Sequence, residues 1–103
     1  MIMSDQSLVD MLLKIAEESG KTKIVGGATI MNFDAGMARV EIVSCWGLEI
    51  NIHDTGTKYR ATFDNSEGRF DRIEKDGKPL DLDRFRKILE VIILLGAKHG
   101  NSH

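Results

Sequence analysis

The feature that most constrains this chain is its central stretch, residues 23–79, where apolar and polar residues alternate and turn residues recur at short intervals. The clearest alternation sets Leu48, Ile50 and Ile52 between polar residues. Every expected connection between strands is short, whereas a parallel crossover needs a dozen residues or more. Neighbouring strands must therefore run antiparallel, and the stretch predicts a meander of about five strands.

The expected strands are separated by residues that favour turns. The five strands are expected at residues 28–33, 37–46, 48–53, 58–63 and 70–75. Gly26 and Gly27 stand just before the first of these, and we interpret them as a bend or bulge where the chain enters that strand.

Two amphipathic segments flank the strands and predict helices. The first helix is expected to end at Gly20, in the position that often adopts a left-handed conformation. The second is expected to begin at Asp81 or Asp83 and to end at Gly96 or Gly100. Because no other part of the chain can cover the apolar face of the sheet, both helices are expected to pack on it. The predicted class is α+β, with an N-terminal helix, the meander and a C-terminal helix.

Length and composition set limits on the function. The 103 residues, 1–103, are expected to form a single domain, and 42% apolar with 29% charged residues is typical of a folded chain. A formal charge of −2 offers no basic excess for phosphates, so we do not expect nucleic-acid binding. The longest apolar run, Val91–Leu95, is too short to cross a membrane. The N-terminus lacks the pattern of a signal peptide, and the cytoplasm is the expected location.

Few residue patterns in the sequence indicate a catalytic site or a metal-binding site. Cys45, His53 and Asp54 are the one set that resembles a nucleophile, a base and an orienting acid. On the predicted strands, however, Cys45 and His53 lie roughly 16 Å apart, far beyond hydrogen-bond reach. His99 and His103 stand four residues apart, but no third ligand follows at metal-ligand spacing. We therefore expect no enzymatic activity, no catalytic residue, no metal and no cofactor.

The second helix carries more apolar surface than one sheet face can cover. Leu94 falls on its polar side, and Ile93 falls at the edge of its apolar stripe. Together with Val91 and Leu95, these residues are the predicted oligomer interface, and a two-fold homodimer is the simplest assembly. The alternative is that the two helices pack side by side and cover everything except Leu94.

These observations favour a non-enzymatic protein-binding module that acts as a small regulator, inhibitor or assembly subunit on a protein partner of unknown identity. Small size and the lack of motifs are also typical of phage-encoded inhibitors of host defence and of immunity proteins. The contacts are expected on exposed strand faces. The residues predicted to bind a partner are Arg39, Glu41, Glu49, Asn51, His53, Lys58 and Arg60.

Two other classes of function remain open. A small-ligand-binding domain or small enzyme would have a pocket between the sheet and the helices. That pocket would be lined by Cys45, Trp46, Tyr59 and His53. A nucleic-acid-binding protein would use basic residues on one sheet face, although acidic residues lie among them. Those basic residues would be Lys58, Arg60, Arg69 and Arg72.

Overall fold

The structure is a computed structural model that describes residues 3–100, with side chains described as far as Ala97. Helix α1 (Asp5–Ser19) precedes the strands and helix α2 (Leu82–Gly100) follows them. The strands are β1 (Lys21–Val25), β2 (Ala28–Ala35), β3 (Ala38–Ser44), β4 (Leu48–Asp54), β5 (Thr57–Asp64), β6 (Arg69–Lys75) and β7 (Lys78–Pro79).

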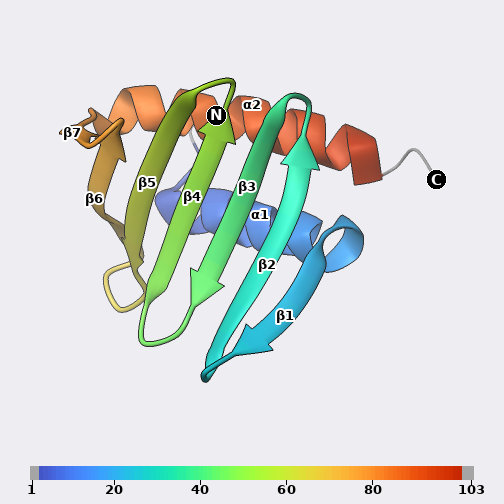
Figure 1. The fold of residues 1–103 in the computed structure, drawn as a ribbon. Helices are drawn as coiled ribbons and strands as arrows, with labels where there is room; N and C mark the ends of the chain where they lie inside the picture. The colour runs from blue at the N-terminus through green and yellow to red at the C-terminus, as the bar shows by residue number, and fades with distance from the viewer. Residues whose placement is uncertain (1–2, 101–103) are drawn as a thin grey trace.

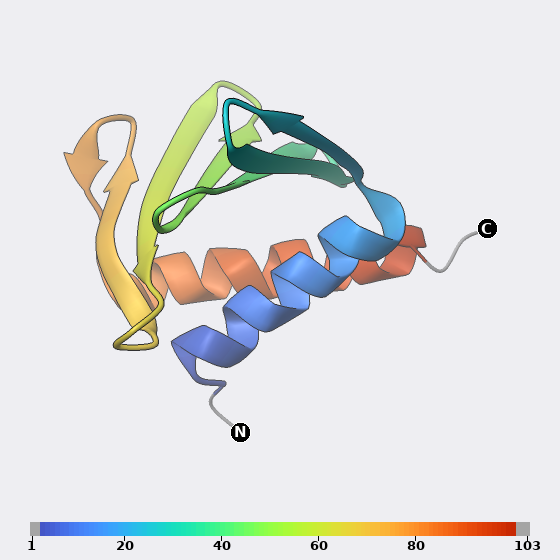
Figure 2. The same ribbon diagram turned by 90° about the horizontal axis from the view of Figure 1, so that it is seen from below.

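The seven strands form one sheet in the order of the sequence, and every neighbouring pair is antiparallel. The α+β class and the meander are therefore confirmed, although the number of strands is seven and not five. Both helices pack on the same face, and the sheet curves over them (Figure 2). The other face, which we call the outer face, carries no helix and is turned toward the viewer in Figure 1.

The two additional strands lie at the edges of the sheet. Gly26 and Gly27 have φ values of 57° and 85°, and they join Val25 to its partner Ala28. Two consecutive residues with positive φ form a type I′ turn, which suits the twist of a two-residue hairpin. The expected bend is thus a hairpin turn, and the segment before it is strand β1. At the other edge, β7 has only two residues, which are too few to show an alternating pattern in the sequence.

The core fills the space between the inner face of the sheet and the two helices. Among its buried apolar residues are Leu8 and Leu12 of α1 and Ile50 and Ile52 of β4. Three aromatic rings stack edge to face where the sheet meets α2. The ring centroids are 5.3 Å apart between Phe63 and Phe70 and 5.2 Å apart between Phe70 and Phe85. These geometries are favourable for aromatic pairs and fix one end of the core.

Helix α1 begins with a side-chain cap, and its end differs from the one predicted. The Ser4 side chain caps the N-terminus by accepting a hydrogen bond from the backbone N–H of Ser7 at 3.1 Å. Gly20 follows the last turn in an extended conformation, not the expected left-handed one. A Cβ atom at Gly20 would lie 2.4 Å from the carbonyl oxygen of Asn32 and 2.7 Å from that of Ala16. Glycine is therefore required here for close backbone approach, and not for its φ angle.

Gly96 does not end α2, which continues to Gly100. A Cβ atom at Gly96 would lie 3.1 Å from Cγ2 of Ile15 and 3.1 Å from Cε2 of Phe33. At this glycine, α2 thus packs tightly against Ile15 of α1 and Phe33 of β2. Among the residues that the structure describes, no helix combines the length and apolar character needed to span a membrane.

Candidate partner-binding surfaces

The seven residues predicted to bind a partner all project from the outer face. The register pairs Arg39 with His53 and His53 with Lys58 across β3, β4 and β5. Two residues further along these strands, Glu41 lies opposite Asn51, and Asn51 lies opposite Arg60. Side chains directly opposite in a pleated sheet share a face, so strand parity brings these residues together on three central strands.

A hydrogen-bonded cluster forms at the centre of this face. Arg60 donates from Nε and Nη2 to Oε1 of Glu49, at 3.0 Å and 2.8 Å. The Asn51 amide donates to Oε2 of Glu49 at 3.1 Å and to Oε1 of Glu41 at 3.4 Å. These neighbours cover Asn51 so completely that it is the one buried polar residue of the described chain. Asn51 was expected to be exposed, and it lies beneath the charged side chains instead.

The cluster also determines the charge of Glu49. Partial burial acts to raise the pKa of its carboxyl group. The hydrogen bonds from Asn51 and Arg60, with the positive charges of Arg60 and Lys58, outweigh burial and hold the pKa below its ordinary value of 4.5. Glu49 is therefore ionised at neutral pH and holds the cluster together.

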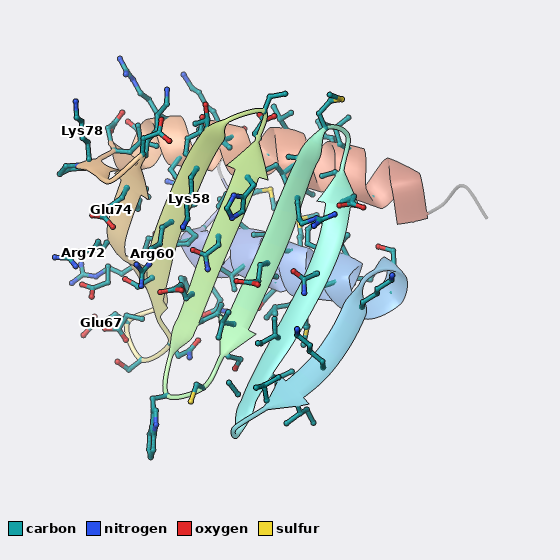
Figure 3. The ribbon with its side chains drawn as sticks, viewed as in Figure 1. Lys58, Arg60, Glu67, Arg72, Glu74 and Lys78 are labelled. Atoms are coloured by element: carbon teal, nitrogen blue, oxygen red, sulfur yellow. The ribbon has the colours of Figure 1, made fainter. Side chains whose placement is uncertain are left out.

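Basic residues on the outer face do not form a continuous positive surface. Arg60 is paired with Glu49, and Glu74 lies opposite Arg60 on β6, with Arg72 two residues before Glu74 (Figure 3). Arg69 lies at the start of β6, opposite Asp64. Acidic groups thus accompany the basic ones, as in the solvated face of an antiparallel sheet. This arrangement lends no support to a phosphate-binding surface.

The residues expected to line a ligand pocket are not brought together. Trp46 is fully exposed at the β3–β4 connection, beside the exposed Cys45. His53 lies on the outer face, whereas Tyr59 lies on the inner face opposite Ile52. Core side chains occupy most of the space between the sheet and the helices, and of these four residues only Tyr59 borders the groove that lies beside α2. Within the described residues, no group of three or more His, Cys, Asp or Glu side chains is arranged to hold a metal ion.

The most exposed apolar surface of α2 is formed by three residues on one flank of the helix. Leu94 is 71% exposed, Val91 is 55% exposed and Leu95 is 39% exposed. Spacings of three and four residues put all three on one side of the helix. Ile93 was grouped with them from the sequence, but it is buried in the core. The exposed apolar surface therefore excludes Ile93.

A methionine outside α2 extends this surface. Met37 is 80% exposed in the two-residue turn between β2 and β3. It lines a groove of 440 Å³ between α2 and the adjoining hairpin ends. The residues lining this groove are Ala35, Met37, Ala38, Asp54, Tyr59, Lys87, Ile88, Val91, Ile92 and Leu95. We call Met37, Val91, Leu94 and Leu95 the α2 strip.

Comparison of the chain with protein-family models, with curated proteins and with solved structures finds no match. The functional argument therefore depends on the chain's own residues.

Proposed function

We propose that this protein is a non-enzymatic protein-binding module that acts as a homodimer. The observation that carries the proposal is the α2 strip, an apolar surface that remains uncovered after the chain has built a closed core. Uncovered apolar surface of this kind marks interaction sites, because leaving it in water gives up the free energy of burial.

A second copy of the chain suits the α2 strip better than a charged partner does. Lys87 and Glu90 stand at spacings of seven and four residues before Leu94, on the same exposed side of α2. Lys87 offsets one of the two acidic groups, Glu90 and the groove residue Asp54, so the surface carries little net charge and two copies repel each other only weakly. In the proposed two-fold dimer, Leu94 of each protomer enters the groove of the other beside Val91 and Leu95.

The outer face of the sheet stays free in this dimer, because α2 packs on the opposite face of the sheet. We propose it as the surface for a different protein, through Arg39, His53, Lys58 and the Glu49 cluster. The dimer would then work as a regulator, an inhibitor or an assembly subunit, and inhibitors encoded by phages remain one such class. Cys45 is an exposed free thiol, which suits the reducing cytoplasm.

The substitution Leu94→Asp tests the dimer. Leu94 is mostly exposed in the protomer, so aspartate there leaves the core intact but sets a charge against the apolar groove of the second copy. We expect the dimer dissociation constant to rise by about tenfold or more, since about 1.4 kcal/mol is enough for that change. Light scattering across a concentration series measures the mass, and circular dichroism checks the fold.

Trp46→Asp is the matched control. It places the same charge on a fully exposed apolar residue outside the α2 strip, and it should remain a dimer. A wild-type protein that stays monomeric at every concentration would show that the proposed homodimer does not form. Equal dissociation of the two variants would show that the α2 strip is not the interface.

A further inference from the structure

The two edges of the sheet differ sharply in their capacity to accept another strand. Strand β7 has two residues, and one of them is Pro79, which has no N–H to donate. Strand β1 has five residues, all of them exposed, and no element of the described chain lies beyond it (Figure 1). An edge with free backbone groups is a template for a further strand. The β1 edge is open over its whole length, whereas at the opposite edge β7 covers only the end of β6, the N–H of Phe70 is bonded to Asp5, and the carbonyl oxygen of Ile73 is bonded to the N–H of Leu80.

The turn at Gly26–Gly27 determines which backbone groups of β1 are free. Residues that flank a two-residue hairpin turn exchange both backbone hydrogen bonds, and hydrogen-bonded pairs then alternate along the ladder. Val25, Lys23 and Lys21 therefore bond to β2. Thr22 and Ile24 direct their N–H and C=O groups away from the sheet, toward the open edge.

The side chains of β1 differ in character between the two faces of the strand. Lys21 and Lys23 lie opposite Asn32 and Ile30, so both project on the outer face. Ile24 projects on the inner side and is 76% exposed, because the end of β1 is not covered by the helices. An added strand would therefore find positive charge along one face and an apolar side chain on the other.

We propose that the β1 edge binds an extended segment of a partner protein in which acidic residues alternate with apolar ones. The acidic side chains lie beside Lys21 and Lys23, and an apolar side chain lies beside Ile24. The backbone of the segment bonds to Thr22 and Ile24, as in other cases of strand addition to a sheet edge. This site is separate from the α2 strip and does not depend on the homodimer.

The same charges disfavour a second copy as the occupant of this edge. Antiparallel pairing of two complete β1 strands about a two-fold axis sets Lys23 directly opposite its counterpart, and like charges at that position are destabilising. If the two strands are shifted so that Lys23 no longer faces a lysine, only residues 23–25 of each strand remain paired. Lysine on an edge strand is a common device against self-pairing. An acidic segment turns the same lysines into favourable contacts.

The experiment uses the full chain and two short capped peptides, one of alternating glutamate and valine and one of alternating lysine and valine. Amide hydrogen exchange followed by NMR reports on each backbone N–H. We expect the Glu–Val peptide to slow exchange at Thr22 and Ile24 by on the order of tenfold, because binding protects bonded amides. The Lys–Val peptide should have no such effect.

Two variants identify the origin of the binding. Ile24→Pro removes a donor that faces the open edge and leaves the β1–β2 ladder intact, and it should abolish the response. Lys21→Glu/Lys23→Glu should reverse the preference, so that the Lys–Val peptide now binds. Lys14→Glu/Lys75→Glu carries the same change in charge away from β1, and it should behave as wild type.

Several outcomes would overturn the proposal. These are an equal response to both peptides, no response at millimolar peptide, and protection confined to α2. Protection of Thr22 and Ile24 that rises with protein concentration in the absence of peptide would assign the edge to a second copy instead. Leu94→Asp should still bind the Glu–Val peptide, so failure of the homodimer and failure of the β1 site are distinguishable.

Discussion

At the scale of the residue, Gly20 shows how one position can be determined by its surroundings and not by its own conformation. Its backbone is extended, which any residue can adopt. A side chain is excluded because Cβ would lie 2.4 Å from the Asn32 carbonyl oxygen, which belongs to the β2 backbone. The passage from α1 into β1 thus depends on a contact that is remote in the sequence.

We expect Gly20→Ala to lower the free energy of unfolding by about 1–3 kcal/mol, the usual cost of forcing extra volume into a packed site. Backbone atoms crowd the new Cβ, and they cannot move aside as a side chain can. Gly47→Ala is the control, because nothing lies within 4 Å of a Cβ at Gly47. Urea denaturation measures both, and equal stability of the two variants would contradict the assignment.

Glu49 provides a prediction that depends on pH. Its pKa in the folded state lies below its ordinary value of 4.5, because hydrogen bonds and positive charges outweigh burial. The stabilisation by the carboxylate is therefore complete above pH 4.5 and is lost as the pH falls through the lowered pKa. We expect Glu49→Gln to cost about 0.2–1 kcal/mol at neutral pH, and less at about pH 3.

Denaturation with urea at the two pH values compares Glu49→Gln with wild type. NMR titration of Arg60→Gln supplies a second measurement, in which the pKa of Glu49 should move upward as its positive neighbour is removed. A difference in stability that grows toward acid pH would show that the cluster does not stabilise the ionised form.

At the scale of the element, α1 is held in place at its first turn by contacts to two other elements. Oδ2 of Asp5 accepts a hydrogen bond from the backbone N–H of Phe70 at 3.2 Å, and Oδ1 lies 3.5 Å from Nε of Arg86. Arg86 also donates to the carbonyl oxygen of Met3. One carboxylate thus joins α1 to β6 and to α2.

We expect Asp5→Ala to lower the free energy of unfolding by about 1–3 kcal/mol, because it leaves a partly buried N–H and a partly buried guanidinium without their acceptor. Asp10→Ala on the same helix removes an exposed carboxylate and should change stability by no more than about 0.5 kcal/mol. Urea denaturation of both proteins is the measurement. An equal loss in the two variants would show that Asp5 does not join the elements.

At the scale of the whole molecule, the α2 strip and the β1 edge lie in different parts of the fold. The strip lies on α2 and the β2–β3 turn, whereas β1 is the free margin of the sheet (Figure 1). The outer face is a third surface, and over β3, β4 and β5 most of its side chains are polar. A dimer formed through α2 would therefore leave both the β1 edge and the outer face of each protomer available for other proteins.

The sequence by itself determined the class, the antiparallel meander and the outward projection of residues such as Arg39, His53 and Lys58. These features depend on local rules, because short connections force antiparallel pairing and side chains alternate along a strand. Strand β1 was not predicted because all five of its residues are exposed, and the strand therefore has no buried face that would require alternating apolar residues. The Gly-Gly pair between two short runs was the signal that could have revealed it.

Only the tertiary structure decided which surfaces stay uncovered. Ile93 and Leu94 are neighbours in an apolar run, yet one is buried and the other is exposed, because α1 packs beside α2 on the same face of the sheet. Met37 joins the α2 strip for a similar reason, since the β2–β3 turn ends next to α2. The sequence fixes local periodicity, whereas the packing of remote elements determines which apolar side chains still face solvent.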